Sequence, residues 1–186
     1  LRERDRSLEL TKEFLEIAGV ESIDELRSTS VEKILDFQTS QYLSANKTFD
    51  FFAPTGGGVG IESDILNTAS QSPVQFVVGT NKDENKIWAA FDPALADADA
   101  DMWNEFCIES FGDNATNARQ TYEKMRPYES PRDLMSAIST DTGFRQRAIS
   151  FAEARVANNQ PTWMYWFTWP TPFMDGALGC CHALDI

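Results

Sequence analysis

Two short apolar segments, far apart in the chain, limit most strongly what it can fold into. Residues 73–79 (PVQFVVG) and 162–169 (TWMYWFTW) are rich in β-branched and aromatic side chains and are apolar on both faces of an extended chain. Strands of this kind are typical of sheets that carry helices on both sides. The sequence therefore predicts an α/β fold in which both segments are buried strands.

The region between these strands, residues 85–158, is predicted to be mostly helical. Its best-marked helix start is residues 130–133 (SPRD), where an N-cap serine is followed by proline at the first helical position and an acidic residue at the third. The last helix is expected from about Phe144, because Ala148 and Phe151 fall on the same helical face.

The first third of the chain is also predicted to be helical. Residues 8–18 carry an apolar stripe that ends before Gly19, residues 22–25 (SIDE) form a capping box, and Ser30 precedes the apolar positions of a third helix. Residues 53–60 (APTGGGVG) follow as a turn-rich stretch. A phosphate-binding loop is disfavoured there, because no lysine followed by serine or threonine comes after the glycines and no strand-to-helix context surrounds them.

Two strands cannot fill a sheet that is covered on both sides, so further strands are expected from outside this chain. The chain begins at Leu1 with neither an initiator methionine nor a signal peptide, and its first residues (LRERDRSLEL) are typical of a charged helix already under way. We therefore interpret residues 1–186 as one piece of a larger domain. With sheet edges and apolar faces open, this piece is expected to aggregate alone or to be held by its complement.

The charge balance is strongly acidic. Aspartate and glutamate together number 29 against 16 lysines and arginines, which gives a formal net charge of -13. Such a chain repels phosphate backbones and anionic membrane surfaces, so neither nucleic acid nor membrane is expected as a partner. No apolar run in the sequence is long enough to cross a membrane.

The three cysteines, Cys107, Cys180 and Cys181, do not form a disulfide framework, since their number is odd and two of them are adjacent. They favour reduced thiols and a cytoplasmic setting. A zinc site is disfavoured, because Cys180, Cys181 and His182 are consecutive and no Cys-x-x-Cys pair exists. Cys181 is also disfavoured as a nucleophile, because adjacent side chains rarely point at one another and nothing marks this thiol as activated.

Two residues stand out by their placement. His182 is the only histidine, and Glu84 follows the first predicted strand. A single histidine is most often structural or exposed, and a loop glutamate is most often solvated. Yet both lie in loops beyond the ends of predicted strands, where open α/β sheets place their sites. A histidine that transfers protons needs a carboxylate partner to hold its tautomer, which makes Glu84 and His182 a candidate pair.

The surroundings of Glu84 resemble a segment of the type B carboxylesterase (cholinesterase-like) family. PVQFVVGTNKDENKIW is similar to the family's strand that reaches Gly-x-x-x-Asp-Glu and then a helix. In that family the glutamate of the Asp-Glu pair is the acid of a catalytic triad. The resemblance assigns this role to Glu84, with Gly79 and Asp83 also matching.

The surroundings of His182 resemble a second segment of the same family. GALGCCHALDI is similar to the loop that ends in Gly-x-x-His-x-x-Glu/Asp, in which the histidine is the general base. The resemblance assigns this role to His182, with Gly179 and Asp185 matching. The acid therefore precedes the base, in the order that α/β-hydrolases use.

Weaker similarities extend the resemblance over essentially the whole chain, in family order. TWMYWFTW is similar to the strand before the histidine loop, TDTGFRQRAISFAEA to the helix before that strand, and AGVESIDELRSTSVEKIL to helices preceding a Phe-x-Pro segment, here Phe52-Ala53-Pro54. The resemblance implies that residues 1–186 are the C-terminal portion of a single carboxylesterase domain. Its fold would be the C-terminal part of an α/β-hydrolase, with helices around a few strands of an incomplete mixed sheet.

One departure from the family decides what this chain can do. None of the ten glycines has serine two positions later, so no Gly-x-Ser-x-Gly nucleophile elbow is present. In the family, the elbow and the oxyanion loop lie upstream of the region where this sequence begins. The resemblance thus implies a Ser-His-Glu carboxylic ester hydrolase whose nucleophile serine lies in a complementary N-terminal half, with this chain inactive alone.

The expected substrate is a small neutral or apolar ester, and no metal or organic cofactor is expected. Trp88 and Phe91 are candidates for lining the substrate pocket, with core packing as the alternative for each. A non-catalytic cholinesterase-like interaction protein stays open as a second hypothesis, and an independent helical binding module as a third. Asp83 is expected to matter much less than Glu84, unless it supports the loop that holds Glu84.

Overall fold

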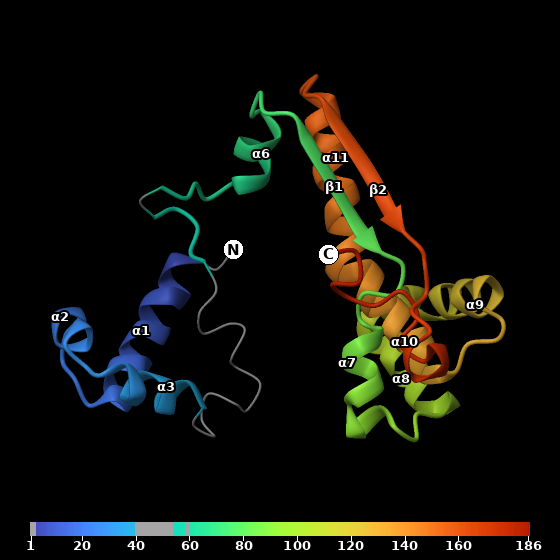
Figure 1. Ribbon diagram of the computed structural model, residues 1–186, viewed down its shortest axis with the longest axis horizontal. Coiled ribbons are helices and arrows are strands. Elements are labelled where there is room, and N and C mark those ends of the chain that lie inside the picture. The colour runs from blue at the N-terminus through green and yellow to red at the C-terminus, as the bar shows by residue number, and fades with distance from the viewer. Residues whose placement is uncertain (1–2, 40–53, 59) are drawn as a thin grey trace. The chain divides into compact units, whose positions relative to one another are not determined.

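The computed structural model describes residues 3–39, 54–58 and 60–186. The chain divides into two compact units, Leu1–Ala69 and Ser70–Ile186, and each is described here by itself. Figure 1 shows a first part built of helices and a second part with two strands beside further helices. Among the described residues, every helix is too short or too polar to span a membrane.

The structure describes four helices in the first unit, and the sequence predicts the first three of them. They are α1 (Arg4–Ala18), α2 (Ile23–Arg27), α3 (Val31–Thr39) and α6 (Ile65–Ser70), whose last residue crosses into the second unit. Gly19 ends α1 in the left-handed region, with φ of 67°. Ser22 accepts a hydrogen bond from the backbone N–H of Glu25, but the Glu25 carboxylate reaches the N–H of Glu21, so the predicted capping box closes one residue early.

The predicted glycine-rich turn is present where the structure describes it. Gly58 and Ile61 form an isolated antiparallel bridge, and Gly57 and Gly60 have φ of 73° and 84°. These angles favour glycine, so a plain turn explains the glycine cluster without a ligand. Of the segments named in the sequence analysis, Leu1, Arg2, Phe52, Ala53 and Val59 lie outside the described residues.

Helices make up most of the second unit. They are α7 (Lys86–Phe91), η1 (Pro93–Leu95), α8 (Ala100–Phe111), η2 (Gly112–Asn114), α9 (Ala115–Met125), α10 (Pro131–Thr140), η3 (Asp141–Arg145), α11 (Gln146–Ala157) and η4 (Phe173–Gly176). The start of α10 is confirmed, since Ser130 accepts a hydrogen bond from the N–H of Asp133. The last helix was expected from about Phe144, but η3 is a π-helical turn that joins α10 directly to α11.

The two predicted strands form one parallel pair, although their bounds differ from the sequence prediction. β1 is Phe76–Asn81 and β2 is Thr162–Phe167, with Phe76 opposite Thr162 and Asn81 opposite Phe167. The predicted start at Pro73 is wrong because the ladder begins only where the N–H of Phe76 reaches the carbonyl of Pro161. Trp169, predicted to lie in the second strand, falls outside it and directly precedes the helix- and strand-breaking Pro170.

Side-chain packing explains why β1 contains a glycine, Gly79. A Cβ atom on Gly79 would lie 2.4 Å from ring atoms of Tyr165, the residue opposite it in the ladder. The Tyr165 ring therefore lies across β1 at a position that only glycine leaves open.

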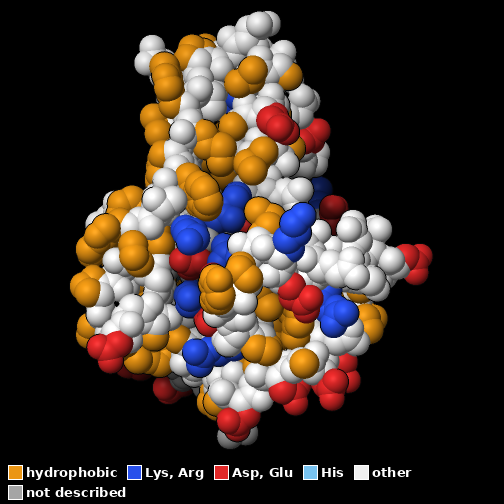
Figure 2. Space-filling view, turned by 90° about the vertical axis from the view of Figure 1, so that its right-hand side faces the viewer, with side chains coloured by type: hydrophobic (Ala, Val, Ile, Leu, Met, Phe, Trp, Pro, Cys, Tyr) orange, Lys and Arg blue, Asp and Glu red, His pale blue; other side chains and the backbone are white. Residues whose placement is uncertain are grey.

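The expectation that both strands are buried on two faces is wrong for the chain as described. Val77, Trp163 and Trp166 are each more than half exposed. The reason is that α11 packs along the strands, as Figure 1 shows, while no other strand among the described residues pairs with them. Figure 2 accordingly shows hydrophobic side chains exposed on the upper part of the molecule, at the height where Figure 1 places β2.

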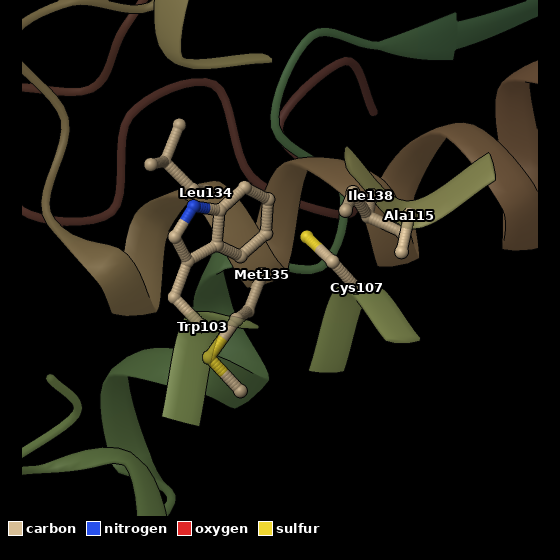
Figure 3. Packing of buried hydrophobic residues seen from close by; sticks show 6 residues of the cluster. All are labelled: Trp103, Cys107, Ala115, Leu134, Met135 and Ile138. Carbon is tan, nitrogen blue, oxygen red and sulfur yellow. The ribbon is translucent and has the colours of Figure 1, made fainter. Parts of the chain in front are cut away.

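The main hydrophobic core of the second unit lies among α8, α9 and α10, as Figure 3 shows. Its buried members are Trp103, Cys107, Ala115, Leu134, Met135 and Ile138. The indole N–H of Trp103 donates to Glu123 on α9, so the polar edge of this ring is satisfied while the rest is buried. Helix α10 thus has one face in this core. It continues through η3 into α11, the helix that packs against β1 and β2.

Replacement of Ile138 tests whether this core stabilises the unit. Ile138 is 1% exposed, so Ile138→Ala should lower the free energy of unfolding by about 2–5 kcal/mol through lost burial and a residual cavity. Ile108 on α8 is 52% exposed, and Ile108→Ala should cost about 0.5 kcal/mol or less. Urea unfolding followed by circular dichroism measures both, and equal costs would contradict this description of the core.

Candidate active site

The parallel strands bring Glu84 and His182 together. Glu84 lies in the turn that leaves β1, and His182 lies in the loop that follows β2. Parallel neighbours end at the same edge of a sheet, so their outgoing loops meet there. Nδ1 of His182 is 2.7 Å from Oε2 of Glu84, although the two residues are 98 positions apart.

Both oxygens of the Glu84 carboxylate have partners. Oε1 accepts a hydrogen bond from the backbone N–H of Asn81 at 2.8 Å, and Oε2 faces Nδ1 of His182. The Glu84 side chain is 8% exposed, whereas the His182 side chain is 46% exposed. A carboxylate this buried needs such donors, and the exposed imidazole keeps its other nitrogen available to a reacting group.

Two aromatic rings lie against the imidazole. The ring of Trp88 is 5.0 Å and the ring of Phe144 is 5.4 Å from His182, measured between centroids. Trp88 and Phe144 also stack on each other at 6.1 Å. Trp88, a sequence candidate for the pocket, therefore contacts the candidate base, whereas Phe91 is exposed and has no such contact described. Contacts of this kind restrict the orientation of the imidazole ring.

The loops that carry Glu84 and His182 are joined by a second pair of residues. The N–H of Asp83 donates to the carbonyl of Cys180 at 2.9 Å, and the N–H of Cys180 donates to Oδ2 of Asp83 at 3.1 Å. The N–H of His182 also donates to the carbonyl of Glu84 at 3.3 Å. The two loops are thus bonded through Asp83 and Glu84 on one side and Cys180 and His182 on the other, at the acid–base pair itself.

The other oxygen of Asp83 faces an arginine. Nη1 of Arg126 is 3.3 Å from Oδ1 of Asp83 and 2.8 Å from Oε1 of Glu129. Burial alone would lower the pKa of Arg126, but the Glu129 and Asp83 carboxylates outweigh burial and raise it. Asp83 is itself buried, and its bonds to Cys180 support the loop that holds Glu84. We therefore expect Asp83 to matter for the position of this loop.

Gly179 makes the approach of the two loops possible. Its φ of 54° lies in the left-handed region, and a Cβ atom there would be 2.8 Å from Oδ2 of Asp83. Any other residue would therefore be strained and would collide with Asp83. This gives a physical reason for the glycine that precedes His182 by three positions.

A further hydrogen-bond network lies beneath the histidine loop. Nδ2 of Asn81 donates to the carbonyl of Cys181 at 2.8 Å and to Oδ1 of Asp185 at 3.0 Å. The hydroxyl of Tyr165 donates to Oδ2 of Asp185 at 2.6 Å. This hydrogen bond lowers the pKa of Asp185 and raises the pKa of Tyr165. Sequence reasoning missed Asn81 and Tyr165, since nothing in their spacing distinguishes them from ordinary strand residues.

The two adjacent cysteines are buried beside the site. Burial raises the pKa of both the Cys180 and the Cys181 thiol, which favours the unreactive protonated form. The Cys180 thiol donates to the carbonyl of Phe167 at the end of β2. Within residues 3–39, 54–58 and 60–186, no group of three or more histidine, cysteine or acidic side chains is arranged to hold a metal ion.

The site opens onto a hollow of about 520 Å³. Its lining includes both members of the acid–base pair and the apolar side chains of Val78, Phe144, Phe151 and Ile186. The arrangement brings together an accessible imidazole, a buried carboxylate that can stabilise its charged form, and an apolar space beside them.

Comparison with known proteins identifies related chains. A family model described as "Carboxylesterase family" matches residues 4–186. A phenmedipham hydrolase from Pseudarthrobacter oxydans is 24% identical over 185 residues, which are 98% of this chain and 37% of the relative. The solved carboxylesterase EST55 of Geobacillus stearothermophilus superposes with a TM-score of 0.68 at 20% identity, over 99% of this chain and 38% of that one. The chain therefore spans less than two fifths of these relatives, and the structural likeness supports the α/β-hydrolase fold.

Replacement of Asp83 tests whether it joins the two loops. Asp83→Asn keeps the shape, but the amide nitrogen must face either the Cys180 N–H or the Arg126 guanidinium, both of which are donors. We expect a loss of about 1–3 kcal/mol in the free energy of unfolding. Asp113→Asn, on an exposed turn, is the matched control and should stay near the parent. Equal stability of both variants would show that the Asp83 bonds contribute nothing.

Proposed function

The chain belongs to the carboxylesterase family, and we propose that it supplies the acid and the base of an ester-hydrolysing triad, Glu84 and His182. The observation that carries this proposal is the 2.7 Å contact between Nδ1 of His182 and Oε2 of Glu84 at the ends of neighbouring parallel strands. Ester hydrolysis agrees with the family and with the hydrolase relative. The roles of the two residues are our proposal.

In the proposed mechanism, a serine outside this chain attacks the ester carbonyl while Nε2 of His182 takes the hydroxyl proton. Glu84 stabilises the resulting imidazolium through Nδ1. The imidazolium then gives its proton to the departing alcohol, which leaves an acyl-serine. A water molecule attacks this acyl group, again with His182 as base, and releases the acid and the free serine. This sequence requires no cofactor.

The substrate that fits this site best is a small ester with neutral, mostly apolar groups. The support comes from the apolar lining next to His182, which includes Phe144 and Phe151, and from the net charge of -13, which disfavours anionic substrates. Buried apolar contact would hold such an ester close to the acid–base pair without a charged anchor.

We also propose that the remaining part of the domain, with the serine and the oxyanion hole, is the physical partner of this chain. The chain spans 37–38% of the two relatives described above. Val77 and Trp163 leave large apolar surfaces exposed on β1 and β2, and such surfaces are favourable places for further strands and helices to pack. A non-catalytic interaction protein is less well supported, because an adhesive surface needs neither Glu84 nor His182.

Substitutions of the acid and the base test the proposed roles in the complete enzyme. His182→Ala removes the proton acceptor and should lower kcat by about 10³–10⁶-fold. Glu84→Gln keeps the shape but removes the negative charge, so kcat should also fall steeply while KM changes little. Glu109→Gln, on the exposed face of α8, is the control. Normal hydrolysis by both site variants, each folded like the parent, would refute the triad assignment.

Separation of the chain from the rest of the domain tests the proposed partner. Residues 1–186 alone should show no turnover of a p-nitrophenyl ester, because the chain contains no Gly-x-Ser-x-Gly. Co-expression with the complementary segment should restore turnover that depends on His182. Steady activity of the isolated chain that disappears in His182→Ala would contradict the proposal, since the chain would then contain its own nucleophile.

A further inference from the structure

A long helical segment in the second unit contains a π-helical turn beside the acid–base pair. Helices α10 and α11 are continuous through η3, the π-helical turn Asp141–Arg145. A π turn takes up more residues than an α turn, so it changes the direction of the side chains that it carries. Neighbouring residues of this turn, Phe144 and Arg145, both reach the site: Phe144 lies against His182, and Arg145 contacts the segment that leads to Glu84.

Arg145 donates to the backbone just before Glu84. Its Nη2 is 2.8 Å from the carbonyl of Lys82 and 3.3 Å from the carbonyl of Asn81. These carbonyls belong to the two peptide units that follow the Asn81 N–H, the donor that holds Oε1 of Glu84. A single charged nitrogen that donates to two successive carbonyls holds both peptide units more firmly than a neutral donor would.

Two further side chains contact the guanidinium of Arg145, those of Asp141 and Trp166. Nη1 pairs with the carboxylate of Asp141 in the first position of η3. The other oxygen of Asp141 accepts the hydroxyl of Tyr122 at 2.7 Å. Burial, together with the hydrogen bond to Asp141, raises the pKa of Tyr122, so this hydroxyl stays a donor. The guanidinium also lies 5.0 Å above the ring of Trp166 on β2.

From this geometry we infer that Arg145 is a positioning residue for the reaction, an inference that rests on the proposed function. It holds the two peptide units between the Asn81 N–H and Glu84, and so restrains the backbone that carries both this donor and the carboxylate that faces Nδ1 of His182. Arg145 touches neither residue's side chain in the contacts described. Its effect therefore passes through the backbone of the turn.

Without the Arg145 guanidinium, the carbonyls of Asn81 and Lys82 would lose the donor that holds them in the turn before Glu84. Glu84 would then sample orientations in which Oε2 no longer faces His182. Misplacement of a catalytic group by about 1 Å can cost about 10²-fold in rate. Substrate binding depends on other surfaces, so the loss should fall on kcat rather than on KM.

The test compares three variants in the complete enzyme. Arg145→Met removes the donors and keeps the length, and kcat should fall about 10–100-fold with KM within about threefold. Arg145→Lys keeps the charge and can reach one carbonyl, so it should recover part of the loss. Arg119→Met is the matched control, because Arg119 also pairs with a carboxylate one helical turn away, Glu123, but lies far along the chain from the site. Its kcat should equal that of the parent.

A second measurement separates positioning from stability. The far-downfield proton resonance of the His182 Nδ1–H, assigned by its loss in His182→Ala, reports the hydrogen bond to Glu84 directly. In Arg145→Met it should broaden or disappear at temperatures where the protein remains folded, and Arg119→Met should retain it. Thermal unfolding of every variant shows which temperatures qualify.

The outcomes distinguish this inference from the proposed function. A lowered Tm with parental kcat per folded enzyme and an intact proton signal in Arg145→Met would overturn the inference. If Arg145→Met does not fold, Arg145→Lys decides: a reduced kcat with a weakened signal supports the inference, and parental values overturn it. If instead His182→Ala stays active, the proposed function fails, while the proton signal still shows whether Arg145 orients Glu84.

Discussion

Six residues of β1 pair in parallel with six residues of β2, and the candidate site depends on this ladder. The pairing ends with Asn81 opposite Phe167, so the loops that carry Glu84 and His182, two residues 98 positions apart, leave the sheet side by side. The bonds between Asp83 and Cys180 and between Glu84 and His182 continue the contact beyond the last strand residue. A shift of one residue in the register would turn every side chain to the other face and separate the acid from the base.

Two adjacent carboxylates are buried at this point, and they are satisfied in different ways. Asp83 accepts from the Cys180 N–H and from Arg126, whereas Glu84 accepts from the Asn81 N–H and faces His182. Because buried charges require partners, each carboxylate determines what must surround it. Both oxygens of Asp83 therefore accept hydrogen bonds from groups that join or support the loops. Glu84 uses one oxygen for the Asn81 N–H and has the other next to the imidazole. This division is consistent with a structural purpose for Asp83 and with the chemical purpose proposed for Glu84.

Local chemistry made much of the fold predictable, and long-range contacts account for what the sequence prediction missed. The N-caps Ser22 and Ser130 and the left-handed Gly19 depend on neighbouring residues alone, so their positions were predicted correctly. The bounds of β1 depend on its partner strand, which sequence periodicity does not reveal. Arg145, in the π turn, contacts carbonyls more than sixty positions away, which local sequence patterns do not reveal. Glu84 and His182 were predicted because strand ends and a family resemblance both pointed to them, and their contact fits that prediction, while their roles stay predictions.

The unequal exposure of the pair fits a proton-transfer role better than a purely structural one. A salt bridge contributes little to stability when both partners are exposed, and burial of both partners adds a desolvation cost that can exceed their attraction. Here Glu84 is held by the backbone within the chain, while His182 is braced by Trp88 and Phe144 and remains open toward an apolar hollow. The rigid part of the arrangement is thus the carboxylate, and the accessible part is the base. An external nucleophile could approach such a histidine without disturbing the interactions that orient it.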